Sequence, residues 1–183
     1  MINKNSIPNQ RLGEEVVIHL RRHWFIFFKL FLFFVTLALI PVIILLVVQS
    51  TSLNLSLGEI SYAFLLVLAL SYYLVMMVFA FTAWTEAYLD VWTLTTYRII
   101  NREQNGLFNR VVSDLYLSKI QDVTAQQRGF FATILHYGDV HIQSAGAQER
   151  FVFEQVPQPY KIAKIIQKLN DQAKKDEAAN QSV

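Results

Sequence analysis

The sequence predicts a membrane α-helical hairpin of two transmembrane helices, followed by a mainly-β domain that a C-terminal helix caps. Two long apolar runs in the first half of the chain predict the hairpin. Short alternating segments, rich in β-branched and aromatic residues, follow and predict strands. The last regular segment repeats its apolar residues at helical spacing, which predicts an amphipathic helix.

Composition limits the classes of protein to consider. Hydrophobic residues make up 54% of the 183 residues, and they concentrate between Trp24 and Trp84. The formal net charge of +2 gives no indication of a nucleic-acid partner. The chain has no cysteine, which excludes disulfides, thiolate catalysis and cysteine metal sites.

The two apolar runs, residues 24–48 and 60–84, are each predicted to span a membrane. A bilayer core needs about 20 apolar helical residues, and both runs exceed that length. Neither shows the polar stripe of a soluble core helix, and Lys29 is the one charge in either run. The first run is also too long for a signal-peptide core of about 7–15 residues. Pro41 predicts a kink in the first helix.

Basic residues predict the orientation of the hairpin. The N-terminal arm, residues 1–23, contains Lys4, Arg11, Arg21 and Arg22, whereas the connection at residues 49–59 contains no lysine or arginine. The positive-inside rule therefore places the arm and everything after the second span in the cytoplasm. The connection becomes an extracytoplasmic loop of a multi-pass membrane protein with both termini cytoplasmic.

The cytoplasmic domain is predicted over residues 85–170. Six segments of strand length follow one another without long helices, which indicates an antiparallel sandwich or a small barrel. The turn signal QNG separates the second and third segments, and the short apolar piece GFFATIL predicts one or two helical turns. Near the end, Ile162, Ile165, Ile166 and Leu169 form one apolar stripe on a helix. Residues 171–183 are polar and predict a frayed helix end or a flexible tail.

Several motifs together resemble the membrane-anchored bacterial pleckstrin-homology-like proteins, the YdbS-like family. They are TTYRII, with Thr95 and Arg98, then LSKIQDV, residues 117–123, and YGDV, residues 137–140. The resemblance covers about residues 12–170. It implies a PH-like fold, a bent β-barrel capped by a C-terminal helix, in the cytoplasmic (inner) membrane of a bacterium. It implies no activity, because a fold does not determine chemistry.

No constellation of catalytic residues is apparent, so we expect no enzyme, no cofactor and no metal. His19 and His23 lie four residues apart on a predicted helix, but that segment lacks the glutamate of a metalloprotease helix and a third ligand. Glu14 is expected in the first turn of a helix. The glycines are isolated, which excludes a phosphate loop, and Ser144 lacks a nucleophile-elbow context.

Arg98, Arg102 and Arg110 are the candidate site residues. Arg98 and Arg102 share parity on one predicted strand, and Arg110 follows the turn. One interpretation is a site for anionic lipid headgroups. The other is pairing with the nearby carboxylates of Asp90, Glu103 and Asp114, which we favour because acidic and basic residues balance after residue 85.

The predicted function is that of a non-enzymatic, membrane-anchored interaction or scaffold module. The hairpin holds a β-domain against the bilayer, and such a domain offers edges and loops to a protein partner or a second copy of the chain. Two alternatives remain open. One is an anionic-lipid headgroup-binding module, and the other is an accessory subunit of a larger membrane complex, in which the small residues Ala69, Ala80 and Ala83 allow close helix contact.

Overall fold

The computed structural model of the protein describes residues 10–11, 13–50, 59–144 and 151–181. The chain forms two compact units. Residues 24–87 form the hairpin, and the residues up to 23 together with those from 88 onward form the β-unit. The β-unit is therefore assembled from two stretches of chain that the hairpin separates.

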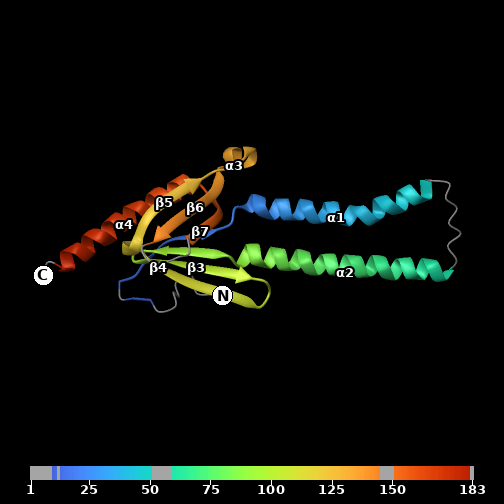
Figure 1. Ribbon diagram of the computed structural model, residues 1–183, viewed down its shortest axis with the longest axis horizontal. Helices are drawn as coiled ribbons and strands as arrows, with labels where there is room; N and C mark the ends of the chain where they lie inside the picture. Colours follow the sequence, from blue (N-terminus) through green and yellow to red (C-terminus); the bar gives the residue numbers. More distant parts are fainter. Residues whose placement is uncertain (1–9, 12, 51–58, 145–150, 182–183) are drawn as a thin grey trace. The chain divides into compact units, whose positions relative to one another are not determined.

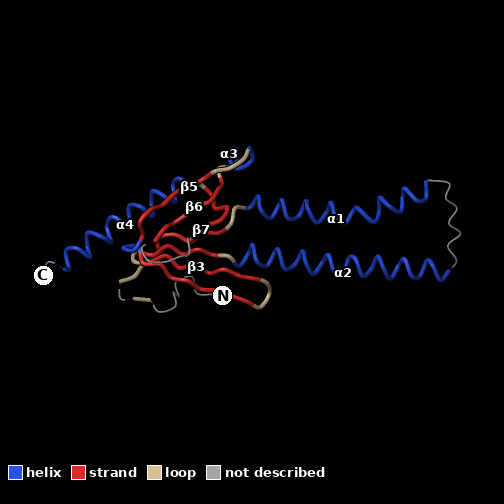
Figure 2. The backbone as a smooth tube through the Cα atoms, in the orientation of Figure 1, coloured by secondary structure: helices blue, strands red, loops and turns tan. Residues whose placement is uncertain are grey.

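The hairpin consists of α1, Trp24–Ser50, and α2, Glu59–Leu89, which run side by side (Figure 2). By length and composition, Trp24–Val47 and Ala63–Leu89 could each cross a membrane. Within each range an apolar stretch of 18 residues has no buried residue, unlike the core helix of a soluble protein, whereas Phe25, Ile26 and Ala87 are buried. Residues 51–58 of the predicted loop lie outside the described residues.

A hydrogen bond between the two helices offsets the effect of Pro41. Proline has no N–H, so the carbonyl of Leu37, four residues earlier, loses its usual helical donor. The hydroxyl of Tyr72 on α2 donates to that carbonyl at 2.9 Å, and Tyr73 donates to the next carbonyl, that of Ala38, at 3.0 Å. The helix continues through Pro41 to Ser50, and α2 supplies the missing donor.

Among the described residues, seven strands form two antiparallel sheets in the β-unit, and Figure 1 shows their course. Sheet A has the order β1-β2-β3-β4, and sheet B has the order β5-β6-β7. The strand bounds are β1 Val16–Arg21, β2 Val91–Thr95, β3 Arg98–Asn105, β4 Asn109–Tyr116, β5 Ile120–Gln126, β6 Tyr137–Ser144 and β7 Phe151–Pro157. Among the described residues no strand ladder joins the sheets, so the expected barrel is two packed sheets without closure.

Strand β1 corrects the prediction of a helix around His19 and His23. Residues Val16–Arg21 pair antiparallel with β2, with His19 opposite Thr93 and Arg21 opposite Val91. The β-branched run VVI favours an extended backbone, and Ile18 and Leu20 alternate with the exposed His19. The chain thus leaves sheet A at the end of β1 and returns to the opposite position in β2.

The short helix predicted from GFFATIL is confirmed as α3, Phe130–Leu135. It lies between β5 and β6 and ends at His136, which adopts a left-handed conformation with φ of 55°. Gly138 follows at a point of close approach, where a Cβ atom would collide with the backbone oxygen of Gln126. A side chain at position 138 would therefore separate β5 from β6.

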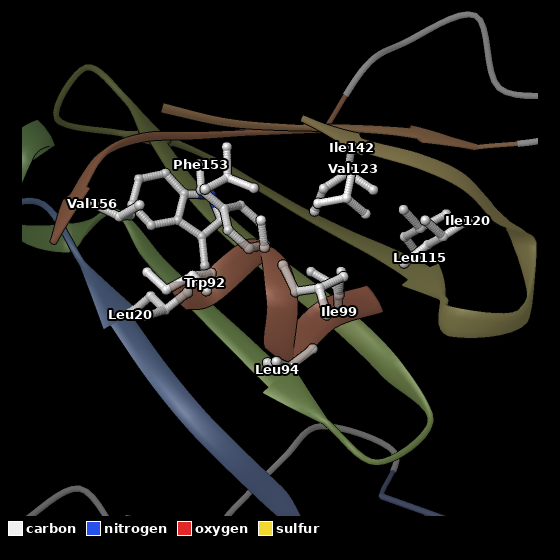
Figure 3. Packing of buried hydrophobic residues seen from close by; sticks show 14 of the residues in the cluster. Leu20, Trp92, Leu94, Ile99, Leu115, Ile120, Val123, Ile142, Phe153 and Val156 are labelled. Atoms are coloured by element: carbon white, nitrogen blue, oxygen red, sulfur yellow. The ribbon is translucent and has the colours of Figure 1, made fainter. Parts of the chain in front are cut away.

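The C-terminal helix α4, Pro159–Gln181, lies against sheet B, as Figure 1 shows. Ile162 and Ile166 enter the core, which confirms the predicted apolar stripe. The helix also continues through the segment expected to be a tail, because Leu169 and Ala173 still pack on the core and its exposed residues are good helix formers. Figure 3 shows the core itself, where Trp92 of β2 lies beside Phe153 of β7.

The 3-10 helix η1, Leu117–Lys119, connects β4 of sheet A to β5 of sheet B. Most residues of the motifs quoted above have structural roles here. Leu117, Ile120, Val123 and Val140 are buried in the core, and the carboxylate of Asp139 accepts a hydrogen bond from the backbone of Gln155 at 2.8 Å. The motifs therefore specify packing between β5, β6 and the end of sheet A.

Candidate functional site

Arg98 lies in a buried ionic cluster on the outer face of sheet A. Its Nε atom is 2.9 Å from Oε1 of Glu14, and its Nη1 atom is 2.6 Å from Oδ2 of Asp114. Thr95 adds a hydroxyl 2.8 Å from the same Glu14 oxygen, and the backbone N–H of Arg11 donates to Oε2 at 3.0 Å. Arg98 is 5% exposed and Glu14 is 2% exposed. Because its members lie before β1 and in β2, β3 and β4, the cluster connects the chain before β1 to these three strands.

The pKa shifts of Glu14 and Arg98 both favour the charged forms of these two side chains. Burial raises the pKa of Glu14, but hydrogen bonds from Arg98, the Arg11 backbone and Thr95 outweigh burial and leave that pKa below its usual value of 4.5. The hydrogen bond to Glu14 raises the pKa of Arg98, which burial opposes. Two carboxylates surround one guanidinium, so the cluster has no spare positive charge for a ligand.

A second cluster surrounds Arg22 where the chain enters and leaves the β-unit. Nη2 of Arg22 is 2.8 Å from Oδ2 of Asp90 and 2.9 Å from Oε2 of Glu154. The other oxygen of Asp90 accepts the backbone N–H of Gln104 at 2.8 Å. Arg22 follows β1, Asp90 precedes β2 and Glu154 lies in β7, so this cluster joins the two sheets at the chain crossings.

Three arginines that have no acidic partner among the described residues form a row on the outer face of sheet A. The register places Arg21, Val91 and Arg102 directly opposite one another on three neighbouring strands, so their side chains share a face. Arg110 is the diagonal neighbour of Arg102, because Arg102 pairs with Val112. At about 4.8 Å between strands, the backbones of Arg21 and Arg102 lie about 10 Å apart. We call Arg21, Arg102 and Arg110 the arginine row.

The three predicted arginines therefore separate into two groups. Arg98 and Arg102 share a face as expected, but Arg98 lies in the buried cluster at one end of the sheet. Arg102 is half-buried and Arg110 is exposed, and within the described chain neither forms an ion pair. Sequence reasoning missed Arg21, because it assigned that residue to a helix. The alternation of VVIHLR was the signal that could have placed it.

The predicted charge pairing holds in part. Asp114 pairs with Arg98 as expected. Asp90 pairs instead with Arg22, because the end of β1 lies opposite the start of β2. Glu103 lies on the inner face of β3, opposite in parity to Arg102, and no ion pair involves it among the described residues. Pairing therefore compensates Arg98 but leaves the arginine row uncompensated.

The two histidines of the arm do not form a ligand pair. The ring of His19 is 3.1 Å from the hydroxyl of its cross-strand partner Thr93. His23 stacks on Tyr137 with ring centroids 5.2 Å apart, and its backbone N–H donates to Gln155. Burial lowers the pKa of His23. Both histidines thus have structural contacts with different parts of the β-unit.

A cleft of about 250 Å³ lies beside the Arg22 cluster, on the inner face of sheet A. Trp92, Asn101 and Ser113 line it on one side, and β7 lines it on the other. Nε1 of Trp92 and Oδ1 of Asn101 are buried without a hydrogen-bond partner among the described residues. Arg22, Glu103 and Glu154 also line this cleft.

Comparisons with known proteins found one matching family and one similar solved structure. The sequence model of a family described as Bacterial PH domain matches residues 25–170, a range that includes α2 and all of α1 except Trp24. A solved structure, the crystal structure of a DUF1696 family protein with a pleckstrin-homology domain from Shewanella loihica PV-4, is 16% identical over 46% of this chain and 70% of that chain, with a TM-score of 0.35. No curated protein matches the chain.

Proposed function

Because the chain belongs to the bacterial PH domain family, we propose that it is a membrane-anchored interaction module on the cytoplasmic face of a bacterial membrane. PH-like domains are lipid- or protein-interaction modules and generally not enzymes. One observation carries the proposal: the apolar hairpin is inserted between two strands that pair with each other, β1 and β2. A β-unit joined to the hairpin at both ends of this insertion has little freedom to leave the membrane surface.

The two connections are short, which makes the anchoring close. Two residues, Arg22 and His23, separate β1 from α1, and Asp90 alone separates α2 from β2. An extended chain spans at most about 3.5 Å per residue, so the first connection reaches about 7 Å. Arg22 and Asp90 are joined by an ion pair, which holds the two connections together. The proposed role is to present the loops and edges of the β-unit to a partner at the bilayer surface.

Anchoring and orientation are tested with single cysteines, since the chain has none. Asn54→Cys should react with a membrane-impermeant maleimide on intact cells, whereas Lys175→Cys should react only after the cells are opened. The protein should also stay with the membrane after carbonate extraction. Reaction of Lys175→Cys on intact cells, or release by carbonate, would contradict the proposal.

The interaction is tested by purification in a mild detergent from cross-linked cells. The full chain should retain a partner that a matched hairpin variant, residues 24–87, does not retain. Retention by the hairpin alone would instead indicate the alternative of an accessory subunit that binds through its helices. A second tagged copy of the chain in the same cells distinguishes a homo-oligomer from a different protein.

Headgroup binding is the second candidate function, and the arginine row favours it. Arg21, Arg102 and Arg110 share one face of sheet A and lack ion-pair partners in the described chain. They lie at the end of the sheet where β1 connects to α1. Each arginine near an anionic surface contributes about 1 kcal/mol, so the row should contribute about 3 kcal/mol, or roughly a hundredfold in affinity.

The test uses a soluble β-unit, and β1 must remain in it. A glycine–serine linker from His23 to Tyr88 replaces the hairpin and preserves the pairing of Arg21 with Val91. Co-sedimentation with anionic liposomes should fall roughly a hundredfold in the Arg21→Ala/Arg102→Ala/Arg110→Ala variant. The matched control, Lys164→Ala/Lys168→Ala/Lys175→Ala, loses the same charge from exposed positions of α4. Equal loss in both variants would indicate nonspecific attraction and would contradict a site.

A further inference from the structure

We propose that the β-unit also contacts the interfacial region of the bilayer through two exposed apolar sites beside the chain crossings. The turn site is Leu107 and Phe108, between β3 and β4. The helix site is Phe130, Phe131 and Ile134 on α3. This inference rests on the proposed membrane anchoring and adds to it a specific surface and a specific occupant, the lipid bilayer.

Both sites expose large apolar side chains next to one another, which is unusual for a surface that contacts only water. Phe108 is 98% exposed, and Phe130 is 73% exposed. On α3 the usual arrangement of an amphipathic helix is reversed, because Ala132 faces the core and the two phenylalanines and Ile134 face outward. Exposed apolar groups that cluster in this way mark surfaces that bind a membrane or a partner.

The sheet register places the turn site at the end where the chain crosses into α1. Arg21, near the end of β1, lies in the same row as Arg102 of β3. From that row β3 continues in the direction of β1 for three more residues before the turn at Gly106. At about 3.4 Å per residue the turn therefore lies about 10 Å beyond the row. The chain itself reaches Trp24, the first residue of α1, three residues after Arg21.

Contacts within the β-unit place the helix site at the same end. His23, the last residue before α1, stacks on Tyr137, and its backbone N–H donates to Gln155 at 2.8 Å. Tyr137 is only two residues from Leu135, the last residue of α3. The helix site is thus close in sequence to Tyr137, which contacts the last residue before α1. It belongs to the connection between two strands of sheet B, whereas the turn site connects two strands of sheet A.

The bilayer is the occupant that these positions favour. Both sites lie where the chain passes into helices that are apolar enough to span a membrane. Each site also has an exposed arginine two residues away, Arg110 after Phe108 and Arg128 before Phe130. Aromatic rings next to basic side chains suit the membrane interface, where the ring enters the acyl boundary and the cation meets lipid phosphate.

The experiment uses the full chain in liposomes, with a single cysteine labelled by an environment-sensitive fluorophore. The test positions are Phe108→Cys and Phe130→Cys, and the control is Lys175→Cys, exposed near the far end of α4. Quenchers are brominated lipids with bromine near the headgroup and aqueous iodide. We expect lipid quenching at least threefold stronger at positions 108 and 130 than at position 175, and iodide quenching at least threefold weaker.

The outcomes separate this inference from the proposed anchoring. Flotation of the liposomes after carbonate treatment shows whether the chain is anchored. If it is anchored and both test labels respond to iodide as position 175 does, anchoring stands and the two contacts are wrong. Protection from both quenchers would show that protein, either a partner or a second copy, covers these sites, and it would overturn the inference. Lipid quenching at only one position would overturn the arrangement of two sites.

Discussion

Arg22 and Asp90 are 68 positions apart in the sequence, yet Nη2 of Arg22 lies 2.8 Å from Oδ2 of Asp90. The whole hairpin lies between them in the chain. The side chain of Asp90 is 5% exposed, and its second oxygen accepts the Gln104 backbone N–H. Arg22 is 21% exposed and also reaches Glu154 of the other sheet. This pair therefore closes the β-unit across the insertion and links sheet A to sheet B.

We predict that Arg22→Ala lowers the free energy of unfolding of the β-unit by about 2–4 kcal/mol, because the buried carboxylate of Asp90 loses its cation. Urea unfolding of the detergent-solubilised chain measures this change. Arg110→Ala is the matched control and should cost about 0.5 kcal/mol or less, since Arg110 is exposed and forms no ion pair among the described residues. In the Asp90→Asn background, Arg22→Ala should cost less than in the wild type. If Arg22→Ala costs the same free energy in both backgrounds, Arg22 and Asp90 do not stabilise each other.

Glu14 predicts a dependence of stability on acid pH. Its pKa is depressed in the folded protein, so it contributes stability above its usual value of 4.5, and that contribution is lost as the pH falls through the lower, folded value. Glu14→Gln should be less stable than the wild type at pH 7, and the difference should shrink below pH 4.5. Unfolding curves from pH 7 to pH 3 for both proteins give the comparison. Parallel curves would show that Glu14 does not titrate as proposed.

Much of the fold could be predicted from the sequence, because the hydrophobic pattern specifies it. The strands from Val91 onward, the turn at Gly106 and the short helix α3 lie where alternation and turn residues indicate. The C-terminal helix packs through Ile162 and Ile166 as its stripe requires. These elements depend on local patterns within about ten residues, which is the range over which sequence reasoning works best.

The parts that could not be predicted depend on pairing across the insertion. Strand β1 has only six residues, and its partner β2 begins 70 positions after it ends. Basic residues before an apolar run suggested an interfacial helix, and nothing local identified Thr93 or Val91 as cross-strand neighbours. The pairing of β1 with β2 determines the partners of Asp90 and Glu14. It also determines the place of Arg21 in the arginine row. Domain residues thus lie on both sides of the predicted anchor.

The docking of α4 predicts a large effect of a buried charge. Ile166 is fully buried in the core, so Ile166→Asp should lower the free energy of unfolding by about 4 kcal/mol or more. Lys168→Asp places the same carboxylate two residues away on an exposed position and should cost about 1 kcal/mol or less. Hydrogen exchange of β5 and β6 amides measures both. Equal loss of protection would mean that the charge acts on helix propensity and not on docking.

The hydrogen bond from Tyr72 to Leu37 predicts a coupling between Pro41 and the second helix. Removing the hydroxyl with Tyr72→Phe leaves the Leu37 carbonyl without a donor, because Pro41 has no N–H to supply. In a membrane environment such an interhelical bond contributes about 0.6–1.7 kcal/mol. Pro41→Ala restores the helical N–H, so Tyr72→Phe should cost clearly less in that background.

The measurement is a double-mutant cycle on unfolding of the hairpin in mixed micelles of mild detergent and SDS. Tyr73→Phe serves as the control, since Ala38 has the N–H of Val42 within its own helix and should couple little to Pro41. A cost of Tyr72→Phe that is the same with proline and with alanine at position 41 would show that the hydroxyl does not replace the missing donor.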